Sequence, residues 1–93
     1  MTQNTLQKHI YLSGRVQGVG FRAFTRKEAS SLGIKGWVKN LADGRVEMKI
    51  KGDSSSVKKM IKKVKKGPSF ARVDDIEIND EEVENYDRFE IRF

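Results

Sequence analysis

The sequence predicts an α+β fold, in which two helices pack on one face of an antiparallel sheet of four strands and a short fifth strand follows at the C-terminal end. Three observations lead to this expectation. Short segments of alternating polar and apolar residues indicate strands, and two segments with a helical apolar repeat indicate helices. Their order is strand, helix, strand, strand, helix, strand. Two such split units with right-handed crossovers are typical of a ferredoxin-like sandwich.

The first strand is expected over residues 6–15, where apolar and polar side chains alternate. A turn rich in glycine follows, and the first helix is expected over residues 21–32. Its apolar face includes Phe21 and Phe24, which we expect to lie in the core, and Gly33 is a natural helix stop.

The second strand is expected over residues 34–41, with Trp37 and Val38 on opposite faces. The pair Asp43-Gly44 predicts a hairpin into a third strand over residues 45–51. Because the helices cover only one face of the sheet, we expect Trp37 to pack, partly buried, on the open face.

The second helix is expected to begin at a cap formed by Asp53 or Ser54 and to end at Gly67-Pro68. Six lysines fall within residues 58–66 and give this helix a basic outer face. Its apolar face follows a near-ideal helical repeat of Val57, Met60, Ile61 and Val64.

A fourth strand is expected over residues 73–78 and a last short strand over residues 88–93. Val73 and Ile76 are one position out of phase, which predicts a β-bulge or a bend.

Nine of the thirteen acidic residues lie after Val73, although the net charge is +6. The simplest interpretation of these charge runs is two solvated faces. The alternatives are a field that attracts small anions, or a nucleic-acid partner.

Composition limits the class of protein. A chain of 93 residues, with no repeat or linker, predicts one domain over residues 1–93, in which residues 1–6 form a loose N-terminal segment. The lack of cysteine and the single histidine, His9, exclude a cysteine nucleophile and a multi-histidine metal site. No apolar run approaches the roughly 20 residues of a membrane span, and no secretion signal is visible, so we expect a cytoplasmic protein without a membrane partner.

The strongest functional signal is the turn between the first strand and the first helix. Gly14, Gly18 and Gly20 punctuate it, and Arg22 stands at the start of the helix. A turn that exposes backbone amides at a helix N-terminus binds anions, and an arginine at its edge adds a fixed positive charge. The pattern is neither a Walker motif nor a dinucleotide-binding motif, so we expect a site for one phosphate group.

A second candidate residue, Asn40, closes the second strand, and the strand–helix–strand connection is expected to bring it beside the mouth of the turn. Its amide can hold and orient a water molecule but cannot act as a strong base. Arginine, backbone amides and asparagine therefore suit a reaction that needs placement and charge neutralisation, such as the hydrolysis of an activated phosphate.

Two segments, Gly14-Arg15-Val16-Gln17-Gly18-Val19-Gly20-Phe21-Arg22 and Gly36-Trp37-Val38-Lys39-Asn40, resemble the signature pair of the acylphosphatase family. Four further segments resemble the family at matching spacing, so that the resemblance covers about residues 8–93. These segments are Asp43-Gly44-Arg45-Val46-Glu47, Gly67-Pro68, Ala71-Arg72-Val73 and Phe89-Glu90-Ile91-Arg92-Phe93. The resemblance implies a ferredoxin-like fold and the hydrolysis of the carboxyl–phosphate bond of acyl phosphates, without a metal or another cofactor.

The resemblance also implies roles for single residues. Arg22 would bind the phosphate and Asn40 would position the attacking water. The family often has a tyrosine or a similar aromatic residue two places after this arginine, and this chain has Phe24 there. Members of the family end in Arg-Tyr, whereas this chain ends in Arg92-Phe93. We expect no consequence of this different ending for the site. The implied phosphate-binding residues are Gln17, Gly18, Val19, Gly20, Phe21 and Arg22.

Three other functions fit parts of the pattern. An RNA-binding module shares the order of elements, but its third strand carries stacking aromatics, and residues 45–50 have none. An accessory domain of a larger protein ranks lower, because Met1 and a terminal strand predict a self-contained chain. A relative without activity ranks lower because Arg22 and Asn40 are present. The expected partners are therefore a small acyl phosphate and inorganic phosphate, bound by a monomer with no nucleic acid.

Overall fold

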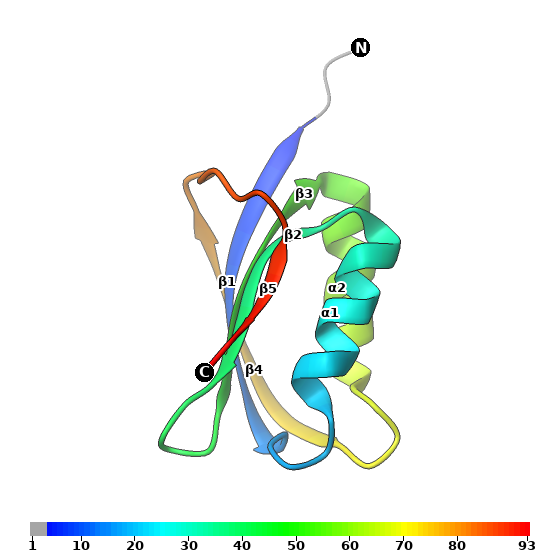
Figure 1. Cartoon of the computed structure of the whole chain (residues 1–93), viewed down its shortest axis with the longest axis vertical. Helices are drawn as coiled ribbons and strands as arrows, with labels where there is room; N and C mark the ends of the chain where they lie inside the picture. Colours follow the sequence, from blue (N-terminus) through cyan, green and yellow to red (C-terminus); the bar gives the residue numbers. More distant parts are fainter. Residues whose placement is uncertain (1–3) are drawn as a thin grey trace.

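The computed structural model describes residues 4–93 and confirms the expected α+β fold, with both helices packed against one face of a single sheet (Figure 1). The expected order of the elements is also confirmed. The elements are β1 (Thr5–Arg15), α1 (Phe21–Leu32), β2 (Lys35–Asn40), β3 (Val46–Asp53), α2 (Ser54–Lys66), β4 (Arg72–Glu81) and β5 (Phe89–Arg92).

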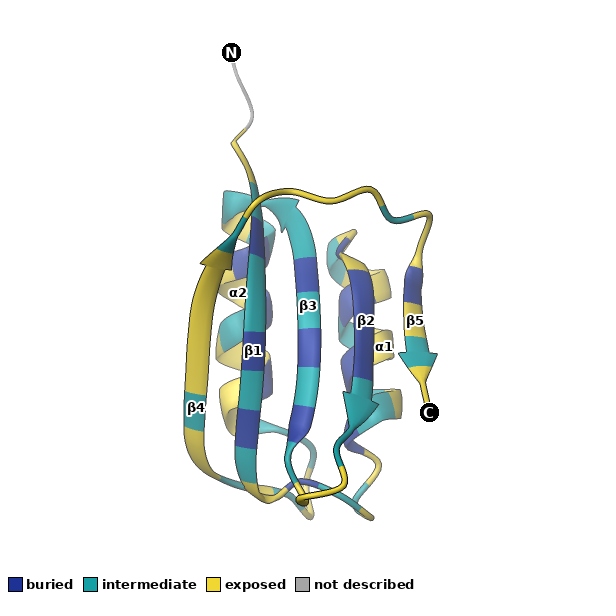
Figure 2. Ribbon diagram, turned by 90° about the vertical axis from the view of Figure 1, so that its left-hand side faces the viewer, coloured by how far each residue is buried: buried dark blue, intermediate teal, exposed yellow. Residues whose placement is uncertain are grey.

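The sheet has the strand order β4-β1-β3-β2-β5 (Figure 2). β1 pairs antiparallel with both β3 and β4, and β2 pairs antiparallel with β3, as expected for the four main strands. β5 pairs with β2 in parallel, which makes the sheet mixed and places β5 beside the strand that ends at Asn40. β1 and β2 are not neighbours, because β3 lies between them.

β1 begins earlier than expected. Thr5 and Leu6 pair with β3, so the expectation of a loose N-terminal segment is wrong for these two positions, and its first three residues lie outside the described part of the chain. The Ser54 N–H donates to the Asn4 carbonyl oxygen at 3.0 Å. This bond ties the chain before β1 to the start of α2.

The predicted irregularity in the fourth strand is a β-bulge. Ser13 of β1 pairs with Asp75, whereas the next residue, Gly14, pairs with Val73, so Asp74 has no partner on β1. One extra residue on β4 shifts its side chains by one position. The bulge therefore explains the slip in the apolar pattern of this strand.

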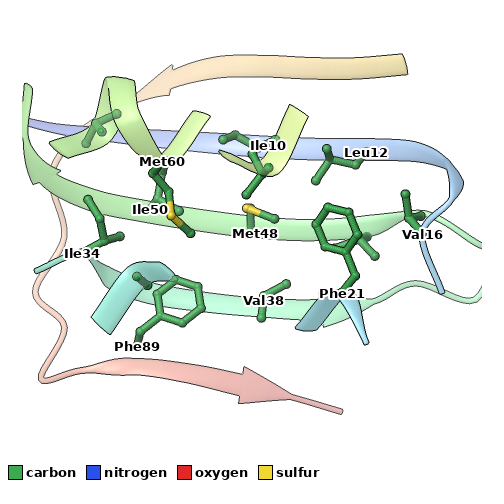
Figure 3. Packing of buried hydrophobic residues seen from close by; sticks show 14 residues of the cluster. Ile10, Leu12, Val16, Phe21, Ile34, Val38, Met48, Ile50, Met60 and Phe89 are labelled. Carbon is green, nitrogen blue, oxygen red and sulfur yellow. The ribbon is translucent and has the colours of Figure 1, made fainter. Parts of the chain in front are cut away.

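The core lies between the sheet and the two helices (Figure 3). Fully buried side chains come from the central strands, such as Ile10 and Met48, and from α2, such as Met60. α2 begins as expected, because the Asp53 carboxylate accepts a hydrogen bond from the Ser56 N–H at 2.9 Å and caps the helix.

α1 buries a different stripe from the one expected. Its buried residues are Phe21, Thr25 and Ala29, and the Thr25 hydroxyl donates to the Phe21 carbonyl oxygen at 2.8 Å. A polar residue thus occupies a buried position that the apolar pattern does not mark. Phe24 is only partly buried, and its ring packs edge-on against Phe21 with 5.9 Å between the centroids. The expectation that Phe24 lies in the core is wrong.

The sheet face opposite the helices carries aromatic and charged side chains. Trp37 packs there as expected, with only 7% of its surface exposed. The cationic groups of Arg92 and Lys39 lie 4.9 Å and 5.6 Å from its ring centroid. The indole is therefore covered by charged side chains that pack on its ring.

Glu47 is the centre of the polar contacts on this face. His9 Nε2 lies 2.6 Å from Glu47 Oε2, and His9 Nδ1 lies 3.2 Å from Glu81 Oε2. Burial acts to raise the pKa of Glu47, but hydrogen bonds from His9 and Tyr11 outweigh it, and the pKa is lowered. The ionised carboxylate therefore stabilises the folded state.

We expect Glu47→Gln to lower the free energy of unfolding by about 1–3 kcal/mol at neutral pH, because a charged acceptor of two hydrogen bonds is replaced by a neutral one. The pKa of Glu47 is lower in the folded than in the unfolded chain. Its contribution is therefore present above the unfolded pKa and is lost as the pH falls through the folded pKa.

Urea unfolding of both proteins from neutral pH down to about pH 3 checks this prediction. The difference between the wild type and the variant should shrink as the pH falls. A difference that stays constant over this range would contradict the stabilising role of the carboxylate.

Candidate active site

The turn between β1 and α1 presents an uncapped helix N-terminus. Gly20 is the N-cap residue of α1, and no side chain caps the helix. The first helical hydrogen bond runs from the Phe24 N–H to the Gly20 carbonyl oxygen at 3.0 Å. The amides of residues 21–23 therefore have no acceptor within the helix, and they lie at the positive end of its dipole. This end of α1 is suited to binding an anion.

Two glycines give the turn its shape. Gly18 has a φ of 73° and Gly20 a φ of 77°. In this left-handed region, a residue with a side chain costs about 1–2 kcal/mol. A Cβ added to either glycine would meet no atom within 4 Å. The backbone conformation, and not a lack of space, therefore requires glycine at both positions.

Side chains on either side of these glycines anchor the turn. Phe21 is buried, and Val19 packs against the core. Gln17 Nε2 donates to the carbonyl oxygens of Leu41 and Arg45, at 2.8 Å and 2.9 Å. Gln17 thus ties the turn to the hairpin between β2 and β3, so that the backbone of the turn is held beside the end of β2.

A cleft of about 220 Å³ opens beside the turn. It is lined by Gly18, Gly20 and Phe21, by Arg22 on the first turn of α1, and by Asn40 at the end of β2. The structure thus brings together the two residues that we expect to perform the chemistry and four of the six expected phosphate-binding residues. The other two anchor the turn through their side chains and do not line the cleft.

Asn40 contributes a buried acceptor. Its Oδ1 atom is buried, and no donor in the described part of the chain contacts it. Buried polar atoms nearly always have a hydrogen-bond partner, so an orphaned one is unusual. Asn40 also lines the cleft, so its side chain lies beside any molecule that binds there.

Arg22 contributes a positive charge that no acidic side chain neutralises. Within residues 4–93, no carboxylate oxygen forms an ion pair with its guanidinium. Its Cζ lies 4.8 Å from the centroid of the Phe93 ring. An aromatic ring thus contacts the guanidinium without cancelling its charge.

β5 supplies two residues of the cleft that sequence reasoning missed. Ile91 and Phe93 line the cleft. That the ending Arg92-Phe93 in place of Arg-Tyr has no consequence for the site stays a prediction, although Phe93 lines the cleft with 99% of its surface exposed. Because β5 is parallel to β2 and Arg92 pairs with Lys39, Phe93 follows at the level of Asn40. The alternation of the last residues predicts a strand, but it does not identify the strand beside it.

The cleft therefore offers a free cation, exposed amides, a neutral acceptor and an apolar wall. None of its described lining residues is a histidine or an acid. No group of three or more potential metal-ligating side chains occurs within residues 4–93. A cleft with these groups can bind a small oxyanion and neutralise its charge.

No helix in the described part of the chain is long and apolar enough to cross a membrane.

Comparison with known proteins gives consistent matches. The family model of acylphosphatase matches residues 8–91. An acylphosphatase from Archaeoglobus fulgidus is 51% identical over 84 residues, which cover 90% of this chain and 94% of that protein.

Solved structures match as well. The crystal structure of acylphosphatase from Bacillus subtilis has a TM-score of 0.92 and 42% identity, over 95% of this chain and 99% of that one. The crystal structure of full-length HypF in its phosphate- and nucleotide-bound form has a TM-score of 0.89 and 27% identity, over 100% of this chain and 12% of that one.

We expect Gly20→Ala to reduce hydrolysis of an acyl phosphate about 100-fold and to weaken binding of inorganic phosphate, because the strained backbone turns preorganised amides away from the anion. Gly33→Ala is the matched control, since Gly33, at the other end of α1, also has a left-handed φ, of 69°, with open space around it, but lies outside the cleft. Both variants should lose about 1–2 kcal/mol of stability. Steady-state kinetics, phosphate calorimetry and urea unfolding check this, and equal kinetic losses in the two variants would contradict it.

Proposed function

Because the chain belongs to the acylphosphatase family, we propose that the cleft between the β1–α1 turn and the end of β2 is the site at which it hydrolyses acyl phosphates. We assign catalysis to Arg22 and Asn40 and phosphate binding to the turn of residues 17–22. The observation that carries this assignment is the meeting, in one cleft, of an unneutralised guanidinium and a buried, orphaned amide oxygen.

In the proposed complex, the phosphoryl group lies in the turn. The amides at the start of α1 and the Arg22 guanidinium meet its negative charge, which would otherwise repel a nucleophile. The amides are held in place before the substrate arrives, since the backbone of the turn is anchored by Gln17 and Phe21. Charge that develops on the phosphoryl oxygens in the transition state is therefore stabilised with little reorganisation.

Asn40 places the nucleophile. Its Oδ1 accepts a hydrogen bond from a water molecule, and this contact holds the water in line with the phosphorus–oxygen bond that breaks. An amide oxygen does not remove the proton. Its contribution is position, which suits a phosphoryl transfer whose transition state is loose.

The proton balance follows from the leaving group. Water adds to phosphorus, the bond from phosphorus to the carboxyl oxygen breaks, and a carboxylate leaves with the bonding pair. A carboxylate is a weak base, so no protein acid is needed to protonate it. The described residues of the cleft include no histidine or acid, and we propose that a phosphoryl oxygen of the substrate takes the proton of the water.

We further propose that the enzyme acts as a cytoplasmic monomer on free acyl phosphates and without nucleic acid. The acidic side chains of the edge strand β4, such as Asp75, Glu77 and Asp80, oppose pairing between two copies along this edge. Trp37 is buried under cations, and the Cζ of Arg45 lies 4.7 Å from the ring centroid of Tyr11, so neither of these two rings on the open face is free for base stacking. Sedimentation of the purified protein tests the proposed monomer, and fractionation of cells that express it tests the proposed cytoplasmic location.

We expect Arg22→Ala and Asn40→Ala to abolish turnover for different reasons, with losses of at least about 100-fold each. Arg22→Ala should also weaken the binding of inorganic phosphate, since a charged donor is lost. Asn40→Ala should leave phosphate affinity and stability nearly unchanged, because its oxygen contacts the water and no protein group.

Hydrolysis assays and phosphate calorimetry on both variants check this division of roles. Arg15→Ala is a suitable control, because Arg15 is an exposed arginine just before the turn and does not line the cleft. Equal loss of phosphate binding in the Arg22 and Asn40 variants would refute the separate assignments.

We also expect hydrolysis of an aryl-carbonyl phosphate to persist in the presence of excess EDTA and to be inhibited competitively by inorganic phosphate, because protein donors alone neutralise the phosphoryl charge. The assay is repeated after dialysis against the chelator and after addition of Mg²⁺. Loss of turnover on chelation, with recovery on adding the metal, would show that a metal ion takes part.

A further inference from the structure

The outer side of the helical layer carries a second cavity, separate from the proposed active site. α1 and α2 lie side by side on the sheet (Figure 2). A groove of about 480 Å³ runs between them. α1 contributes Phe24, Glu28 and Leu32, which are spaced four residues apart on one face. The groove shares no lining residue with the active-site cleft.

The groove has an apolar floor. Phe24 and Leu32 are partly buried and form its two apolar parts, and the half-buried Glu28 lies between them on the helix. At 1.5 Å per residue, these two positions are about 12 Å apart along the helix. The volume and length lie in the range of small-molecule pockets, which begin at about 300 Å³. They fit a short chain or a ring rather than the surface of a folded protein.

The rim of the groove is strongly basic. Lys59, Lys62, Lys63 and Lys66 of α2 line it. Glu28 is the only acidic residue among the described lining residues, and its Oε2 lies 3.6 Å from Lys63 Nζ. Four positive charges thus face one negative charge across an apolar surface. This imbalance is specific to one face of the helix, because Lys58 and Lys65 of the same helix do not line the groove.

We propose that the groove between α1 and α2 binds a free organic anion with a single apolar chain, whose chain lies on Phe24 and Leu32 and whose carboxylate or phosphate head contacts the lysines. The charge of the rim selects an anion, and the floor selects an apolar body. The site does not depend on the assignment of Arg22 and Asn40, and its occupant binds without being cleaved.

Decanoate, below its micellar concentration, is a suitable probe. Its binding to the whole chain is measured by calorimetry and by amide chemical shifts, in the presence of saturating inorganic phosphate to occupy the active site. We expect shifts in residues of α1 and α2 that line the groove. Decyltrimethylammonium, which has the same chain and the opposite charge, should bind at least about tenfold more weakly.

Two double variants separate the groove from the net charge. Lys59→Glu with Lys66→Glu reverses two lysines of the groove, and Lys58→Glu with Lys65→Glu reverses their neighbours outside it. The first pair should weaken decanoate binding about tenfold, which is the size expected when weak, exposed ion pairs become repulsions. The second pair should leave the affinity within about twofold, and both pairs should keep the hydrolase activity of the wild type.

Four results would overturn the proposal. Equal loss of affinity in the two double variants would show that only net charge attracts the anion, and equal binding of the two detergents would show a merely apolar surface. Displacement of decanoate by inorganic phosphate would place it in the active site. Binding to vesicles of phosphatidylglycerol, with no binding of free decanoate, would make a membrane surface the partner.

Discussion

The burial of Phe21 is the constraint on which the proposed active site depends. Phe21 is the first residue of α1, and only 2% of its surface is exposed. Gly67, in the turn after α2, lies so close that a Cβ there would be 2.9 Å from the Phe21 ring. The ring is therefore held from several sides, and it fixes the start of α1 against the sheet. The positions of Arg22 and of the uncapped amides are set by the packing of this one ring.

The site also needs a contact across the sheet, since β3 separates β1 from β2. Gln17 provides it through two hydrogen bonds to the carbonyl oxygens on either side of the hairpin that follows Asn40. The turn that presents the amides and the strand end that presents Asn40 are thus joined directly. The side chain of Gln17, which does not line the cleft, therefore helps to set the geometry of the residues that do.

The sequence predicts most of the fold because local signals and long-range packing agree. Asp43-Gly44 indicates the hairpin, Asp53 caps α2, and the phase slip between Val73 and Ile76 marks the bulge. Agreement of this kind between levels is typical of natural sequences. Arg22 and Asn40 are candidates because the two segments that contain them resemble the signature pair of the acylphosphatase family, and their roles stay a proposal.

The features that were not predictable depend on tertiary contacts. Thr25 can be buried because its hydroxyl bonds to the backbone, whereas Phe24 lies at the side of the buried stripe and is only partly buried. The one extra residue of β1, Thr5, pairs with Asp53 of β3, a contact that the alternation of residues 6–15 does not indicate. The place of β5 beside β2 is likewise invisible in the alternation of its residues, although it decides that Phe93 reaches the cleft.

The composition of the cleft limits the substrates that it can serve. Arg22 lies beside Ile91 and Phe93, and 99% of the surface of Phe93 is exposed, so solvent reaches this side of the cleft. None of the described lining residues can donate a proton to a leaving alkoxide, which is a strong base. An acyl phosphate needs no such donor, because it leaves as a carboxylate. A site built from charge and position alone therefore favours anhydrides over ordinary phosphate esters.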